Sequence, residues 1–290
     1  MTWLPDKNQQ TPLHGNTLVI LATLISATTI IAIYYFYWGW QEDDVFISLR
    51  YARNLLEGNG LVWNKGEHVE GYTNFLFTLM ISGLGWMGVD LLNAAIALSI
   101  AGLLITLAAL SQAHRIIPPL SEEPRKLERY IRYSPLFIAC CSPPLIVWSL
   151  GALETTLFTA FTTIGVLVFL KYVSSPSSNK WLTACSLSFA AATLTRPEGG
   201  LFMAFTGLFL LIWLIKTQNL RTAIKQCVIL SAPYLFIIGS YALWKLHYYG
   251  DVIPNTWYAK SYGVPYEVKL TNGFNHFFFF FLRFFLLSTR

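Results

Sequence analysis

A succession of long apolar stretches constrains the fold of this chain more than any other feature of its sequence. A helix that crosses a bilayer needs about 17–25 predominantly apolar residues. Stretches of this kind lie near residues 17–39, 91–113, 134–152, 155–173, 181–197, 199–216 and 227–246, and a further one begins near Phe274. Only 12% of the residues are charged, whereas a soluble domain has about 25%. We therefore predict an all-α protein, a polytopic transmembrane helix bundle.

The apolar stretch 73–88 is ambiguous, because it is short and rich in glycine. If it crosses the membrane, the strongly basic segment 114–133 lies outside. If it instead re-enters the membrane surface within an outer loop, 40–90, most basic residues lie inside, as the positive-inside rule favours. We therefore predict a re-entrant 73–88. This topology also places the segments 151–155, 196–200 and 248–260 on the same outer face as that loop.

An amphipathic helix is predicted over 43–57, early in the outer loop. Asp43 or Asp44 suits its N-cap and the positive end of its dipole, and Gly58 is typical of a helix end. The expected apolar face consists of Val45, Leu49, Ala52 and Leu56. Such a helix should lie in the plane of the membrane surface.

The remaining chain continues the same pattern. We predict six spans within 91–246, a second outer loop at 247–272 and the start of a further span at 273–290, all in a single transmembrane domain over 1–290. Because no segment follows the last apolar stretch, we expect the protein to be C-terminally truncated. The net charge of +5 does not indicate nucleic-acid binding, since the basic residues of a membrane protein are concentrated in its cytoplasmic loops.

Four groups of residues, in this order along the chain, carry a resemblance to a known family. They are the acidic pair with the residues after it (43–55, 58–64, 66–67 and 70–76), Gly-Ala-Leu-Glu-Thr at 151–155, Thr-Arg-Pro-Glu-Gly at 195–199, and the residues at 248–251, 254–256 and 258–260. The chain resembles GT-C superfamily glycosyltransferases, and most of all the mycobacterial terminal arabinofuranosyltransferase group and its bacterial relatives. That group more often has Ser-Gly-Leu/Met-Glu-Thr where this chain has Gly-Ala-Leu-Glu-Thr.

The resemblance implies a glycosyltransferase in the bacterial cytoplasmic membrane, a multi-pass protein whose active site faces the periplasm or the cell exterior. It would move a sugar, a pentofuranose by the closest likeness, from a polyprenyl-phosphate donor to a glycan, lipid or protein acceptor of the cell envelope. The expected partners are this donor, the acceptor and membrane lipids, with no nucleic acid. No cofactor is indicated. His68 lies among loop acids, but a single histidine in such a place is more often solvated than metal-bound. A requirement for a divalent metal ion is left open.

Sugar transfer from a lipid phosphate needs a base for the acceptor hydroxyl and cations for the departing phosphate. A carboxylate at a half-desolvated helix start can have its pKa tuned for the first task. The resemblance implies that Asp43, the first acid of the pair, is this base and that Asp44 is a supporting or metal-facing carboxylate; solvated helix caps are the alternative. Arg50 and Arg53 could bind a phosphate bidentately or extend to lipid headgroups.

Further substrate-binding candidates come from each outer segment. They are Glu70, Tyr72, Glu154, Arg196, Glu198, Asn255, Tyr258 and Lys260. Glu154 stands out because an acid within an apolar hairpin is costly unless it has a partner or faces a polar cavity. Pairing of Arg196 with Glu154 or Glu198 is the structural alternative, and Lys260 is the best remaining candidate for a phosphate ligand.

Two other functions remain open. A transporter or flippase of lipid-linked sugars would also use intramembrane charges. Transporters, however, usually show internal repeats and place charges at the bilayer midplane, and neither pattern is found in this sequence. The other is an inactive, truncated relative that only binds a lipid or a partner.

Overall fold

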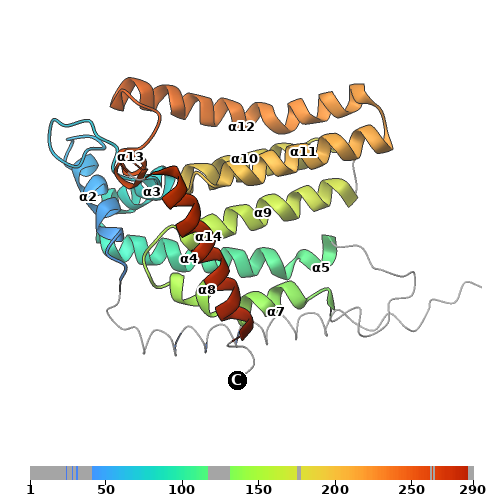
Figure 1. The fold of residues 1–290 in the computed structure, drawn as a ribbon, viewed down its shortest axis with the longest axis horizontal. Coiled ribbons are helices and arrows are strands. Elements are labelled where there is room, and N and C mark those ends of the chain that lie inside the picture. The colour runs from blue at the N-terminus through green and yellow to red at the C-terminus, as the bar shows by residue number, and fades with distance from the viewer. Residues whose placement is uncertain are drawn as a thin grey trace, which may run out of the picture. The chain divides into compact units, whose positions relative to one another are not determined.

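The computed structural model describes residues 24, 28, 31, 41–116, 131–174, 178–261, 263 and 265–286. These residues form helices and connecting loops, with no strand among them, and four of their helices are long and apolar enough to cross a membrane. The predicted class, an all-α polytopic membrane protein, is confirmed. The chain divides into two compact units, Met1–Val252 and Ile253–Arg290, and each has its own helices (Figure 1).

The first unit holds most of the helices. In chain order they are α2 (Val45–Leu56), α3 (Phe75–Trp86), α4 (Leu91–Ser111), α5 (Ala113–Ile116), α7 (Ser134–Cys140), α8 (Pro143–Trp148), α9 (Thr155–Ser174), α10 (Lys180–Thr195), α11 (Gly199–Thr217) and α12 (Leu220–Tyr249). The second unit holds α13 (Asn255–Ser261) and α14 (Tyr266–Leu286). The four candidate spans are α4 with α5 (Leu91–Ile116), α9, α11 and α12.

The long helices match the stretches predicted at 91–113, 155–173, 199–216 and 227–246. Helix α12 starts earlier than predicted because Asn219 caps it, its side-chain oxygen accepting the N–H of Thr222 at 2.9 Å. Helix α10 has 16 residues, about 24 Å of helix, which is less than the roughly 30 Å of a hydrocarbon core. The stretch predicted at 17–39 falls outside the described residues except for residues 24, 28 and 31.

The predicted span at 134–152 is not one helix. The structure has two short helices there, α7 and α8, separated at Cys141 and Ser142. Ser142 is extended, with φ −86° and ψ 102°, because the residue before a proline is disfavoured in the helical region. Pro143 then begins α8, a position where its missing N–H costs nothing.

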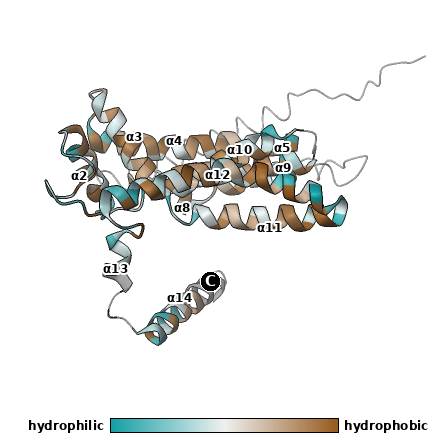
Figure 2. Cartoon of the chain, turned by 90° about the horizontal axis from the view of Figure 1, so that it is seen from above, coloured by the Kyte–Doolittle hydropathy of each residue, from teal (hydrophilic) through white to brown (hydrophobic). Residues whose placement is uncertain are grey.

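The long helices of the first unit pack side by side. Helix α9 contacts α4 and α10, and α12 contacts α10 and α11. Helices α2 and α3 lie together at one end of this bundle, at the left in Figure 1. The connections before α9 and between α10 and α11 reach the same end (Figure 1), as predicted for the segments 151–155 and 196–200. Hydrophobic residues cover the long helices, and hydrophilic ones gather toward their ends (Figure 2).

Helix α3 belongs to the end that carries α2. It has 12 residues, about 18 Å of helix, too short to cross a hydrocarbon core of about 30 Å. Its buried side chains Phe77 and Ile81 pack with Val45 and Ala52 of α2 and with Ala94 of α4. A short apolar helix that packs under α2 fits a re-entrant 73–88, whose depth in the membrane stays a prediction.

The contact between α4 and the start of α9 fixes the turn that carries Glu154. Ser99 donates its hydroxyl to the carbonyl of Leu153 at 2.7 Å, and Thr156 donates to the carbonyl of Ser99 at 2.5 Å. The backbones approach so closely because residue 102 is glycine: a Cβ there would collide with the backbone of Thr156 and Leu157.

Gly102→Ala is therefore expected to lower the free energy of unfolding by about 1–3 kcal/mol, the usual cost of overpacking. Gly239→Ala is the matched control, because it also lies inside a helix but a Cβ there would have no atom within 4 Å. Thermal unfolding of the purified protein in detergent measures both. Equal melting temperatures for the two variants would contradict the close α4–α9 contact.

Candidate functional site

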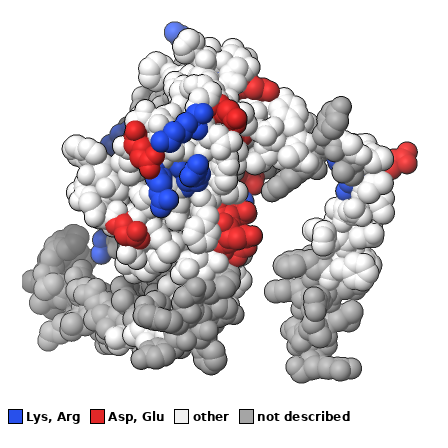
Figure 3. Space-filling model, turned by 90° about the vertical axis from the view of Figure 1, so that its left-hand side faces the viewer, with Lys and Arg blue, Asp and Glu red and all other residues white. Residues whose placement is uncertain are grey.

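Charged side chains gather at the end of the first unit that carries α2 (Figure 3). The exposed ones on α2 and the residues around it are Asp43, Asp44, Arg50, Arg53, Glu57, Lys65 and Glu67. More charges lie beneath them, buried against the ends of the long helices. Three arrangements result: an open acidic pair, a cluster around Glu154 and a cluster around Glu70.

The predicted amphipathic helix exists as α2, but its buried face differs from the prediction. The buried residues are Val45, Ser48, Tyr51, Ala52 and Asn54, whereas Leu56 is 39% exposed. Helix α2 packs against α3 and α4, and its polar side chains are buried where they have hydrogen-bond partners. Asn54, for example, donates to the carbonyls of Val62 and Trp63 at 2.7 and 3.0 Å.

The acidic pair lies at the start of α2, and both carboxylates are exposed. The carbonyls of Asp43 and Asp44 accept the N–H groups of Phe46 and Ile47 at 3.1 and 3.2 Å. Asp44 occupies the N-cap position, but its side chain makes no capping hydrogen bond. The predicted cap therefore holds for the backbone only, and the carboxylates are open to solvent.

The second arrangement surrounds Glu154, which is 8% exposed. Asn74 donates to one carboxylate oxygen at 2.9 Å, and Nη1 of Arg196 lies 3.4 Å from the other. Asn74 also bonds to the hydroxyl of Ser48 on α2, and Nε of Arg196 lies 3.7 Å from Glu198. Three predicted substrate residues are thus brought together, because Arg196 pairs with both Glu154 and Glu198.

The turn before Glu154 contains a strained residue. Ala152 has φ 58°, the one positive φ among the described non-glycine residues, and it is fully buried. An alanine in the left-handed region costs about 1–2 kcal/mol. It stands where the resembling group more often has glycine, which adopts this conformation freely. The packing around Ala152 therefore maintains this strained turn, and the turn sets the direction of the Glu154 side chain.

The third arrangement is a buried ion pair between the loop that joins α2 to α3 and helix α12. Glu70 is 4% exposed and Lys245 is 6% exposed, and Lys245 Nζ lies 2.6 Å from Glu70 Oε2. Tyr241 donates to the other carboxylate oxygen at 3.2 Å. Burial raises the pKa of Glu70, and the Lys245 ammonium opposes that rise. Lys245 was not among the predicted site residues, although a lysine inside an apolar helix is itself a sign of a buried partner.

Tyrosines surround this ion pair and hold the loop. Tyr249 donates to the carbonyl of Leu61 at 2.7 Å and its hydroxyl lies 3.3 Å from that of Tyr72. Tyr51 donates to the carbonyl of Val69 at 2.7 Å. Burial raises the pKa of Tyr72 far above its ordinary value. Glu70 and Tyr72, both predicted to bind substrate, therefore have protein partners that hold the loop between α2 and α3 against α12.

The other predicted residues belong to the far face of α2 or to the second unit. Arg50 and Arg53 occupy the opposite face of α2 and line a groove with the start of α4. Asn255 and Tyr258 are exposed on α13 of the second unit, and the side chain of Lys260 lies outside the described part. Within the described residues no three metal-ligating side chains gather, and the ring of His68 packs edge-on against Tyr248 at 4.5 Å.

Two curated proteins are similar to this chain. A terminal β-(1→2)-arabinofuranosyltransferase of Mycobacterium tuberculosis is 28% identical over 257 residues, which is 84% of this chain and 39% of that protein. One of the same name from Corynebacterium glutamicum is 30% identical over 271 residues, 85% of this chain and 37% of that protein. The predicted resemblance is confirmed. The chain spans less than two fifths of the length of either relative. No family model and no solved structure matches it.

Proposed function

We propose that this chain acts as a membrane glycosyltransferase that moves an arabinofuranosyl unit from a polyprenyl-phosphate donor to a glycan, lipid or protein acceptor of the cell envelope. The observation that carries this proposal is the similarity to two terminal arabinofuranosyltransferases over 84–85% of the chain. Two exposed carboxylates, those of Asp43 and Asp44, directly precede α2.

Asp43 is the proposed base. Its carboxylate accepts the proton of the acceptor hydroxyl while the hydroxyl oxygen bonds to the anomeric carbon. The bond from that carbon to the phosphate oxygen breaks, and the phosphate leaves with the electron pair. Asp44 supports this role: it lies four residues before Ser48, so the helical register puts it on the face of α2 that bonds to Asn74.

Arg196 is the proposed cation for the departing phosphate. Its side chain is 37% exposed while it pairs with Glu154 and Glu198, so part of the guanidinium stays open to a ligand. Lys260 as a phosphate ligand, with Asn255 and Tyr258 as positioning residues, stays a prediction from the resemblance, because all three belong to the second unit, which is described by itself. Glu70 and Tyr72 shape the loop, and the carboxylates of Glu154 and Glu198 orient Arg196. A bidentate guanidinium suits a phosphate because its donors match the spacing of two oxygens.

The proposed orientation places the α2 end on the outer face of the bacterial cytoplasmic membrane. The support is the excess of basic residues in the segments predicted at the other end, above all 114–133. A lipid-linked donor is consistent with this place, because its phosphate lies at the membrane surface and its chain in the hydrocarbon.

The proposal is tested by offering membranes that contain the chain a panel of labelled polyprenyl-phospho-sugars. We expect label from the arabinofuranosyl donor, and not from hexosyl donors, to be found on an acceptor after extraction of lipids. Transfer of a hexose alone would contradict the sugar, and no transfer from any donor would contradict the activity. Membranes without the chain are the control.

A further inference from the structure

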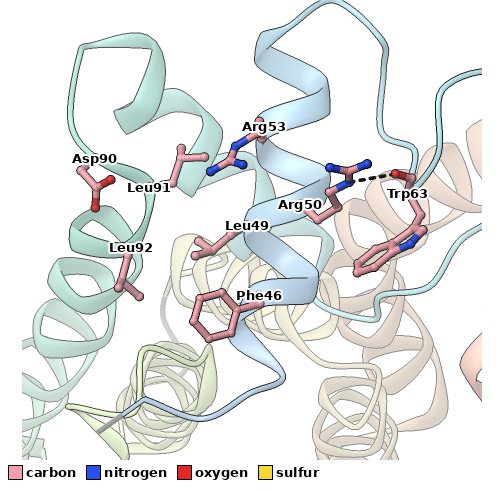
Figure 4. Close-up of a pocket in the computed structure, with 8 residues that line it drawn as sticks. All are labelled: Phe46, Leu49, Arg50, Arg53, Trp63, Asp90, Leu91 and Leu92. Carbon is pink, nitrogen blue, oxygen red and sulfur yellow. Dashed lines mark hydrogen bonds between the residues drawn. The ribbon is translucent and has the colours of Figure 1, made fainter. Parts of the chain in front are cut away.

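A groove lies between α2 and the start of α4, on the side of α2 that faces away from the clusters described above. Its volume is about 330 Å³. Apolar side chains from both helices line it, and two arginines, a tryptophan and an aspartate complete it (Figure 4). The residues of this α2–α4 groove are Phe46, Leu49, Arg50, Arg53, Trp63, Asp90, Leu91 and Leu92.

The two arginines of the groove have no carboxylate partner among the described residues, whereas Lys65, Arg196 and Lys245 each form an ion pair. Arg50 uses only its Nε, which donates to the carbonyl of Trp63 at 3.1 Å, as the dashed line in Figure 4 shows. Two guanidiniums one turn apart, with most of their donors unused, attract an anion that can accept several hydrogen bonds.

The helical register separates this groove from the Glu154 cluster. At about 100° per residue, Arg53 lies roughly 140° and Arg50 roughly 200° around α2 from Ser48, which bonds to Asn74. An anion bound by the arginines is therefore on the far side of the helix from Glu154 and Arg196. The groove is therefore a place for a phosphate apart from Arg196, the proposed cation for the departing phosphate.

The surroundings of the groove are those of a membrane surface. Its α4 wall begins a candidate span at Leu91. Large apolar side chains around it are exposed: Phe46 by 54%, Trp63 by 43%, and Trp86 and Met87 at the neighbouring turn by 83% and 72%. Tryptophan and arginine beside the end of a span are typical of the interface between headgroups and hydrocarbon.

We propose that the α2–α4 groove binds a bilayer glycerophospholipid, whose phosphate bonds to Arg50 and Arg53 and whose chains run along the apolar side chains toward the hydrocarbon. Asp90 contributes a negative charge to the same groove, and its side chain already accepts the N–H of Asn93 at 3.0 Å. A singly charged phosphodiester fits this charge balance better than a doubly charged phosphate monoester. The bound lipid would hold α2 at the membrane surface, and the proposal is independent of the proposed enzymatic function.

The experiment is native mass spectrometry of the purified full chain with added phosphatidylglycerol, at several lipid concentrations. Arg50→Gln with Arg53→Gln is expected to weaken lipid binding about tenfold or more, because the charge-assisted hydrogen bonds from both guanidiniums to the phosphate are lost. The matched control is Arg221→Gln with Lys225→Gln, which removes the same charge from exposed positions on α12 and should bind as the wild type does.

A single variant and two competitors separate lipid binding from loss of folding and from donor binding. Arg53→Gln alone removes a side chain without a hydrogen-bond or ion-pair partner in the described residues, so its melting temperature should be unchanged while lipid binding falls. Polyprenyl-phospho-arabinofuranose, itself a phosphodiester, and inorganic phosphate are added as competitors, and neither should displace the phospholipid. Equal binding by the groove and control variants would overturn the proposal. Displacement by polyprenyl-phospho-arabinofuranose would also overturn it, because the groove would then be a donor site.

Discussion

Replacing Lys245 with methionine is expected to lower the free energy of unfolding by about 3–5 kcal/mol, the usual cost of leaving a buried charge without its partner. Glu70 lies 2.6 Å from Lys245, and both side chains are buried. Glu70→Gln is expected to cost a similar amount, because the ammonium of Lys245 would then lack its counter-charge. The pair connects the loop between α2 and α3 to α12, so its loss should also loosen the tyrosine contacts around Leu61 and Val69.

Thermal unfolding in detergent, followed with a thiol-reactive dye, measures this prediction, because Cys140 and Cys185 are buried in the folded protein. Lys225→Met is the control: it lies on the same helix but is exposed, and such substitutions usually change stability by less than about 0.5 kcal/mol. The double variant Glu70→Leu with Lys245→Met should recover much of the loss, since apolar replacements of a buried pair are often neutral. A double variant that loses the sum of both single effects would contradict a direct pair.

Replacing Asp43 with asparagine is expected to reduce sugar transfer by about 10²–10⁴-fold, the usual contribution of a general base. Asparagine keeps the shape of the side chain but does not accept the proton of the acceptor hydroxyl. The Asp43 side chain is exposed, so the variant should fold, insert and melt as the wild type does. The measurement is the initial rate of transfer from a labelled polyprenyl-phospho-arabinofuranose at equal protein content.

Asp44→Asn is the matched comparison, because it removes the same charge from the neighbouring exposed position. We expect a smaller loss for Asp44→Asn, as for a supporting carboxylate. A larger loss at Asp44 than at Asp43 would exchange their roles. Equal, small losses at both positions would mean that the pair serves only the start of α2.

Much of the helical framework follows from the sequence, because long apolar stretches have few alternatives in a membrane. Helices α4, α9, α11 and α12 were predicted for this reason. The break between α7 and α8 was not, although Pro143 and Pro144 carried the information. The hydrophobicity of 134–152 favoured one span. The helical region, however, is disfavoured for a residue that precedes a proline, so the helix is interrupted at Ser142.

The site was predicted only where a residue is unusual in its own surroundings. Glu154 and Arg196 interrupt apolar segments, so their pairing was among the predicted alternatives, and the structure brings them within 3.4 Å. The Glu70–Lys245 pair joins positions that lie far apart in the chain, and helical periodicity carries no information about such a contact. The buried face of α2 was mispredicted for a related reason: Ser48 and Asn54 are buried where they bond to residues outside the helix, Asn74 and Val62.

The most direct test of the proposed activity uses proteoliposomes that contain the purified chain, a labelled polyprenyl-phospho-arabinofuranose and an arabinofuranose oligosaccharide as acceptor. We predict that the label moves to the oligosaccharide with the wild type and stays on the lipid with Asp43→Asn. A flippase would instead move the intact labelled lipid between leaflets without forming any product. Such movement without transfer by the wild type, or transfer by Asp43→Asn at the wild-type rate, would contradict a glycosyltransferase with Asp43 as its base.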